Sequence, residues 1–105
     1  MAQPIFINFT DHNGDVIKTY TTVSVKTGMM DRVYDFADRA IEIKSKNDVS
    51  MKEVKEINQE MKAIVVAVFG NQFSYDELNE NVDHEELEAA FQRIVTRTRG
   101  TLRKN

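Results

Sequence analysis

The 105-residue sequence predicts an α+β fold, in which an N-terminal β-hairpin packs on a small bundle of three to four helices. Residues 4–25 are rich in β-branched and aromatic residues and are interrupted by one polar turn, as in a hairpin. Later segments repeat apolar residues at steps of three and four, as amphipathic helices do. A two-stranded hairpin is not stable alone in water, so it must lie on these helices.

The hairpin is predicted to consist of strands over residues 4–10 and 16–25. The first strand carries Ile5, Ile7 and Phe9, and a polar cluster over residues 11–15 follows it. Within that cluster, Asn13-Gly14 tolerates the positive φ angles that tight hairpin turns require. We therefore expect an antiparallel pair, with Thr27-Gly28 breaking the chain after the second strand.

A first helix is predicted over residues 29–46. Its apolar residues cover about half of the helix circumference, more than one packing neighbour needs. They form two flanks: Met29, Val33, Phe36, Ala40 and Ile43 on one, and Met30, Tyr34, Ala37 and Ile41 on the other. Two interpretations remain open. The helix is either wedged between the hairpin and the bundle, or leaves a flank rich in Met and aromatic residues open to a partner.

Serine residues mark the starts of two further helices. Ser50 and Glu53 stand in the capping-box relation, which predicts a long amphipathic helix over residues 50–69. Ser74 and Glu77 repeat this relation at the start of a short helix over residues 74–79. Between the two helices, Gly70 suits the left-handed position that ends many helices.

The last helix is predicted over residues 83–99, beginning with a third capping relation between Asp83 and Glu86. Its apolar face is narrow and consists of Leu87, Ala90, Phe91, Ile94 and Val95. Gly100 is expected to close it, and residues 101–105 are expected to fray. We expect residues 1–105 to form a single domain.

Composition disfavours several classes of protein. The net charge of −3 and the pI near 5.4 disfavour a duplex-binding protein, which usually presents a strongly basic face. The start of the chain does not resemble a signal peptide, and no apolar run approaches the ~18 residues of a membrane span. We therefore expect a cytoplasmic protein. A basic C-terminal end, which includes Arg93, Arg97 and Arg99, keeps a small nucleic-acid-binding regulator as an alternative.

No catalytic, metal or cofactor site is expected. The chain has no cysteine and no G-x-S-x-G elbow, and its glycines form no phosphate-binding loop. Asp11-x-Asn13-x-Asp15 begins like a calcium loop, but Val16 occupies the position that needs glycine. His84 lies among carboxylates without a second imidazole nearby, which favours a solvated histidine over a metal ligand.

The order of motifs along the chain resembles the tail assembly chaperone family of bacteriophages and prophages with long, non-contractile tails. The strongest match is F-G-N-Q-F-S-Y-D-E-L at residues 69–78, followed by an N-x-x-x-D-x-x-E-L element that runs from Asn79 to Glu86-Leu87. Upstream, the strand element G-x-x-x-K-x-Y runs from Gly14 to Tyr20 and precedes the first helix. The resemblance covers about 90 residues, and these motifs are structural, not catalytic.

The resemblance implies a small cytoplasmic chaperone that binds the tape measure protein and helps recruit tail tube subunits during tail assembly. Such a protein acts in the bacterial host and is not expected in the mature virion. Because a tape measure helix offers apolar stripes, we expect helix-in-groove binding. The candidate contact residues are Met29, Tyr34, Phe36, Met61 and Phe73. A homo-oligomer and, as a further alternative function, a structural head or tail subunit of the virion remain open.

Overall fold

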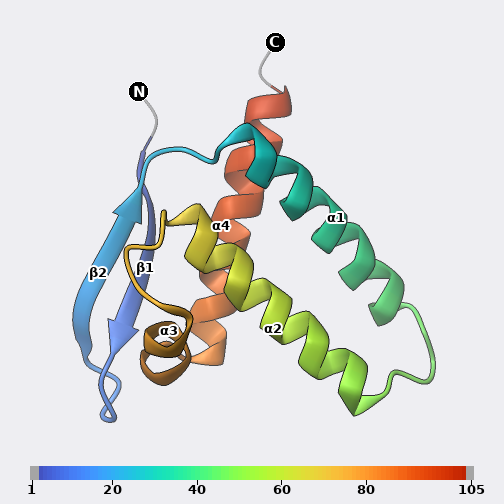
Figure 1. The fold of residues 1–105 in the computed structure, drawn as a ribbon, viewed down its shortest axis with the longest axis horizontal. Coiled ribbons are helices and arrows are strands. Elements are labelled where there is room, and N and C mark those ends of the chain that lie inside the picture. The colour runs from blue at the N-terminus through green and yellow to red at the C-terminus, as the bar shows by residue number, and fades with distance from the viewer. Residues whose placement is uncertain (1–2, 104–105) are drawn as a thin grey trace.

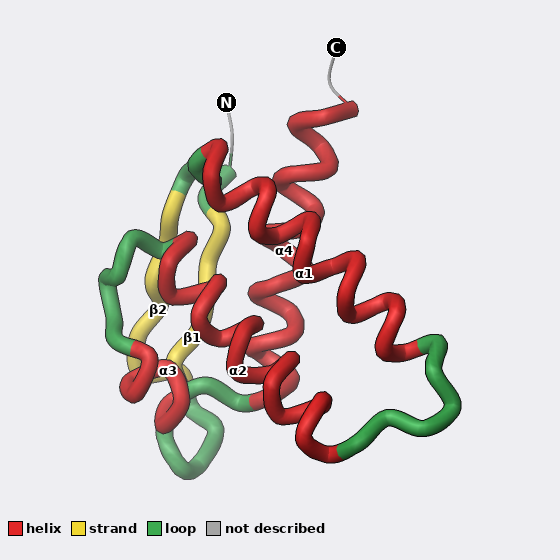
Figure 2. Tube along the Cα trace, turned by 45° about the vertical axis from the view of Figure 1, so that its right-hand side comes forward, coloured by secondary structure: helices red, strands yellow, loops and turns green. Residues whose placement is uncertain are grey.

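The computed structural model describes residues 3–103 and has the element order β1 (Ile5–Thr10), β2 (Val16–Thr22), α1 (Thr27–Lys44), α2 (Met51–Val68), α3 (Tyr75–Asn81) and α4 (His84–Arg103). Figure 1 shows the β-hairpin on one side of the molecule and the helical hairpin of α1 and α2 extending toward the other. α4 passes between these two parts, and Figure 2 shows the same arrangement after a turn of 45°. The predicted α+β fold, a hairpin followed by helices, is confirmed.

β1 and β2 pair antiparallel, with Ile5 opposite Thr22 and Ile7 opposite Tyr20. Alternate residues of β1 are buried, so one face of the hairpin lies on the helices. Gly14 adopts φ +85° in the turn, as predicted. β2 ends at Thr22 and not at residue 25, because its partner strand begins at Ile5, directly opposite. A longer second strand would have no hydrogen-bonding partner there.

Both predicted capping boxes of the central region are present. The Ser50 hydroxyl accepts from the Glu53 N–H at 3.1 Å, and the Glu53 carboxylate accepts from the Ser50 N–H at 3.2 Å. Ser74 and Glu77 form the same pair of bonds at 3.0 and 2.8 Å at the start of α3. These caps are local in sequence, which is why spacing alone predicts them.

Gly70 ends the α2 segment at φ +69°, and Asn71 follows at φ +60°. Several helix ends differ from the sequence-based expectation: α1 ends at Lys44 and not at residue 46, and α3 ends at Asn81 and not at residue 79. α1 begins at Thr27 and includes Gly28, and α4 continues through Gly100 to Arg103. Residues 101–103 are helical and residues 104–105 lie outside the described part, so the expected fraying stays a prediction. A single interior glycine weakens a helix by ~1 kcal/mol relative to alanine without ending it.

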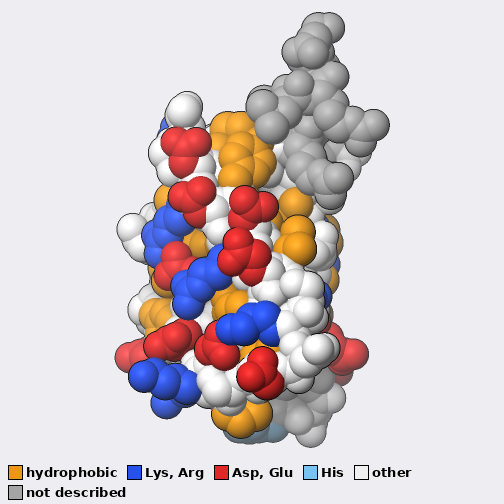
Figure 3. All heavy atoms as spheres, turned by 90° about the vertical axis from the view of Figure 1, so that its right-hand side faces the viewer, with side chains coloured by type: hydrophobic (Ala, Val, Ile, Leu, Met, Phe, Trp, Pro, Cys, Tyr) orange, Lys and Arg blue, Asp and Glu red, His pale blue; other side chains and the backbone are white. Residues whose placement is uncertain are grey.

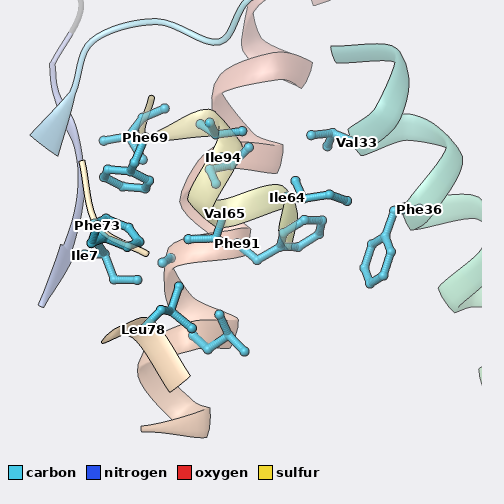
Figure 4. Close-up of a cluster of buried hydrophobic side chains, with 14 of the residues drawn as sticks. Ile7, Val33, Phe36, Ile64, Val65, Phe69, Phe73, Leu78, Phe91 and Ile94 are labelled. Atoms are coloured by element: carbon cyan, nitrogen blue, oxygen red, sulfur yellow. The ribbon is translucent and has the colours of Figure 1, made fainter. Parts of the chain in front are cut away.

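The core lies where the β-hairpin, α2 and α4 meet, and Figure 4 shows its side chains converging. α1 joins this core through Val33 and Phe36, and the Phe36 ring lies edge-on to Phe91 of α4 at 5.1 Å between centroids. α2 contributes buried residues only in its last two turns. The fully or nearly buried residues of α2 are Ile64, Val65 and Val68.

Candidate partner-binding surface

The five predicted contact residues have different environments. Met29, Tyr34 and Met61 are half-buried, whereas Phe36 is 4% exposed and Phe73 is 3% exposed. The two phenylalanines are part of the hydrophobic core, so a partner meets neither ring while the fold is intact. Whether any of the five residues contacts a partner stays a prediction.

Tyr34 positions α1 against α4. Its hydroxyl donates to the backbone carbonyl of Thr98 at 3.4 Å, while Thr98 is 1% exposed and donates its own hydroxyl to the Val95 carbonyl. Part of the Tyr34 ring remains accessible. This residue therefore both holds the helices together and lies at the surface.

The outer half of the α1–α2 hairpin is poorly covered. No residue from 37 to 63 is buried, although this segment contains the C-terminal part of α1, most of α2 and the connection between them. Three large apolar side chains are exposed there: Ile41 (66%), Met51 (79%) and Val54 (37%). Figure 3 views the molecule from this side and shows hydrophobic side chains among acidic and basic ones. Exposed apolar side chains that lie together in one large patch mark interaction sites, whereas single ones are ordinary on protein surfaces.

On α2, this exposed surface is continuous with the core. Val54, Ile57 and Met61 follow one another at steps of three and four, so they share one face of the helix with buried Ile64 and Val65. The face is buried at Ile64 and Val65, half-buried at Ile57 and Met61, which pack against the core, and exposed at Val54. An incoming helix would therefore extend the existing core.

Ion pairs cross between α1 and α2 along their shared seam. Arg32 lies 3.2 Å from Glu60, and Arg39 lies 3.8 Å from Glu56. At the tip, Lys46 donates to Glu53 at 2.8 Å, which raises the pKa of Lys46. The Lys46 hydrogen bond, helped by the Ser50 backbone N–H, lowers the pKa of the Glu53 carboxyl. Exposed pairs of this kind fix geometry more than they add stability.

The free edge of β1 is closed by side chains of α4. Glu86 accepts from the Asn8 backbone N–H at 2.9 Å and pairs with Arg93 at 2.9 Å. Arg93 in turn donates to the Phe6 carbonyl at 2.9 Å and stacks over the Phe6 ring at 3.8 Å. Side chains thus occupy the edge where another strand would bind.

Arg97 continues this contact and donates to the carbonyls of Val23 and Gln3. Two arginines of the basic C-terminal end therefore hold the β-hairpin on α4. The side chain of Arg99, which was also considered for phosphate contacts, lies outside the described part. This use of Arg93 and Arg97 gives no support to the nucleic-acid alternative.

The candidate metal positions have other roles. Asp11 Oδ1 accepts from the backbone N–H groups of Asn13 and Asp15 at 2.9 and 3.0 Å, so the carboxylate shapes the turn. His84 lies 3.3 Å from Glu88, one helical turn away. Among the described residues, no group of three or more His, Cys, Asp or Glu residues could hold a metal ion.

Within the same part of the chain, no helix is long and apolar enough to cross a membrane.

Comparison with known families identifies the chain at the level of a family. The family model described as "phage tail chaperone protein" matches residues 5–102, which include every helix and strand apart from the last residue of α4. No curated protein and no solved structure matches the chain significantly. Because the family match covers almost the whole sequence, the chain belongs to the phage tail chaperone protein family.

Proposed function

We propose that this protein is a tail assembly chaperone that binds the tape measure protein and helps recruit tail tube subunits around it. The family match over residues 5–102 is the observation that carries this proposal. The protein acts in the cytoplasm of the bacterial host and leaves before the virion is complete. Its role is to cover the apolar surface of a long helical protein until tube subunits replace it, so it needs no catalytic group.

The partly exposed apolar face of α2 supports this role. Val54, Ile57 and Met61 offer an apolar stripe at helical spacing, which is the geometry of helix-in-groove binding. An amphipathic helix of the tape measure protein packs along this stripe and adds its own apolar residues to the core. The half-buried residues Met29 and Tyr34 widen the surface on α1.

Co-expression tests the proposal directly. The partner is the product of the long, coiled-coil-rich reading frame expected beside this gene, and its solubility is compared with and without the chaperone. We expect the chaperone to keep the long product soluble and to co-purify with it. If the long product stays insoluble and does not co-purify, tape measure binding is refuted.

A matched pair of variants tests the α2 surface. Val54→Lys places a charge in the apolar stripe at a residue that is already 37% exposed, so the fold should be retained. We expect this variant to lose most co-purification of the long product. Gln59→Lys adds the same charge at an exposed α2 position outside the stripe and should bind normally. Circular dichroism melting curves of both variants establish that they are folded. Equal binding by the two folded variants would exclude the α2 stripe.

Mass spectrometry of purified particles tests the location. We expect the tube and tape measure proteins to be detected and this chain to be absent. A stoichiometric amount in the particles would instead support the alternative of a structural subunit.

A further inference from the structure

The two edges of the β-hairpin differ, and the edge of β1 is closed. Glu86 of α4 accepts from the outward-facing N–H of Asn8 at 2.9 Å. Arg93 donates to the outward-facing C=O of Phe6, also at 2.9 Å. In an antiparallel pair, two residues opposite one another either exchange hydrogen bonds or both point their backbone groups away from the partner strand. Thr19 lies opposite Asn8, so its N–H and C=O point away from β1.

On β2 the corresponding groups are open. Neither the N–H nor the C=O of Thr19 has a hydrogen-bonding partner among the described residues. Thr21 lies opposite Phe6, so its backbone groups point outward too, and its C=O accepts from the Gln72 side chain at 2.7 Å. We call the outward-facing backbone groups of Thr19 and Thr21 the open edge. Figure 1 shows β2 as the outer strand, on the side of the molecule away from α1.

The open edge already binds one amide donor. The side chain of Gln72 is exposed, and its amide occupies the place on Thr21 where the backbone N–H of an added strand would bind. Exposed apolar side chains flank the open edge at both ends: Val16 (57%) and Ile17 (58%) precede it, and Val23 (63%) follows it. In strand addition, main-chain hydrogen bonds supply affinity and neighbouring side chains supply specificity. The outer side of β2 offers both.

Lys18 gives this strand its charge. It is the one charged residue of β2, its side chain is exposed, and its ammonium lies 4.8 Å from the centre of the Tyr20 ring. It joins no ion pair with a described side chain. An acidic residue of an added strand would be attracted here, whereas a Lys or Arg would be repelled. Because the register shifts at Ile17, which has no partner residue on β1, the edge is too irregular for unselective pairing.

We propose, on the basis of the function proposed above, that the open edge binds an extended, acidic segment of the tail tube subunit by strand addition. The chaperone then has two partners, and their shapes separate the sites. The apolar stripe of α2 fits a helix, as in the tape measure protein, whereas the open edge fits an extended segment. The β-hairpin and the outer half of the α1–α2 hairpin extend to opposite sides of the molecule, so both partners can bind at once (Figure 1).

Proline at position 19 tests the site. Proline is tolerated on an edge strand where the missing N–H faces outward, so Thr19→Pro removes a donor of the open edge and spares the β1–β2 ladder. Asn8→Ala is the matched control, because it removes the same side-chain bond between Thr19 and Asn8 but keeps the Thr19 N–H. We expect Thr19→Pro to bind purified tail tube protein about tenfold or more weakly than Asn8→Ala does. Both variants should still keep the co-expressed tape measure product soluble.

Hydrogen exchange of the wild type provides a second readout that needs no variant. We expect the amides of Thr19 and Thr21 to exchange more slowly when the tail tube protein is bound, because they then donate to the added strand. Lys18→Glu should also weaken binding of the tube protein, through repulsion of its acidic segment. Circular dichroism establishes that each variant is folded.

The outcomes separate this proposal from the chaperone function itself. Equal binding of the tube protein by folded Thr19→Pro and Asn8→Ala, or unchanged exchange at Thr19 in the complex, would overturn the strand-addition site. A wild type that solubilises the tape measure product without binding the tube protein would overturn this site alone. A wild type that does neither would refute the proposed function as well.

Discussion

Phe73 is surrounded by aromatic rings. Its centroid lies 5.0 Å from Phe9, 4.8 Å from Tyr20 and 5.7 Å from Phe69, and the side chain is 3% exposed. Phe73→Ala therefore leaves a cavity at the junction of the β-hairpin and α3. We expect it to lower the free energy of unfolding by about 3–5 kcal/mol in urea denaturation. Phe6→Ala, at a ring that is 37% exposed, should cost clearly less. Equal losses would show that Phe73 is not a core residue.

Glu53 provides a prediction about pH. Its pKa is lowered chiefly by the Lys46 hydrogen bond, so the folded state favours the carboxylate. The stabilising contribution is present above the ordinary pKa of the carboxyl and is lost as the pH falls through the lowered pKa. Removing the donor with Lys46→Gln should raise the pKa of Glu53 toward its ordinary value. Carbon-detected NMR titration of the Glu53 carboxyl measures this change.

Lys44→Gln is the matched control for the titration, because Lys44 has no hydrogen bond to Glu53. It should leave the pKa of Glu53 close to its value in the wild type. A Glu53 titration curve that is identical in Lys46→Gln and in the wild type would contradict the assigned cause.

Among the elements, α4 has a second role beyond its apolar face. Glu86 accepts the Asn8 N–H and orients Arg93, so Glu86→Ala leaves a backbone donor of β1 without its acceptor. The expected loss is about 1–3 kcal/mol in the free energy of unfolding. Hydrogen exchange at the Asn8 amide should become faster than in the wild type. Glu85→Ala, at an exposed neighbour, should change both quantities little. Unchanged protection of Asn8 in Glu86→Ala would contradict this role.

Sequence spacing predicted the features that depend on near neighbours. The caps at Ser50 and Ser74 and the turn at Gly14 each need residues only a few positions apart. Two other features depend on more than near neighbours, and spacing did not predict them. The last residue of β2 is set by where its partner β1 begins, and α4 continues past Gly100 as part of one long helix. The edge contacts of Arg93 and Arg97 link residues that are far apart in the sequence and were missed for the same reason.

The candidate surface shows the same limit. Helical periodicity identified the apolar residues of α1 and α2 but did not show which of them the other elements cover. Phe36 is buried under α4, whereas Ile41, more than one turn later, is 66% exposed because it lies on the outer half of the hairpin. An apolar flank is visible in the sequence, but the point where the core ends requires the tertiary structure.

The whole molecule is flat, with extents of 43 × 38 × 18 Å, and its helical hairpin extends beyond the core. Buried residues hold the inner part of this hairpin, at Val33 and Phe36 on α1 and from Ile64 onward on α2. The outer part is held by contacts between α1 and α2 and by exposed ion pairs. Stability is therefore expected to differ along the same two helices.

Hydrogen exchange of the dilute protein measures this difference. We expect amides in residues 38–44 and 52–57 to exchange by local opening and those in residues 64–68 to exchange only by global unfolding, because only the last of these segments contains buried residues. Adding the tape measure product should slow exchange on the α2 stripe. Uniform protection along α2 in the dilute protein would show that the outer half is as stable as the core and needs no partner to order it.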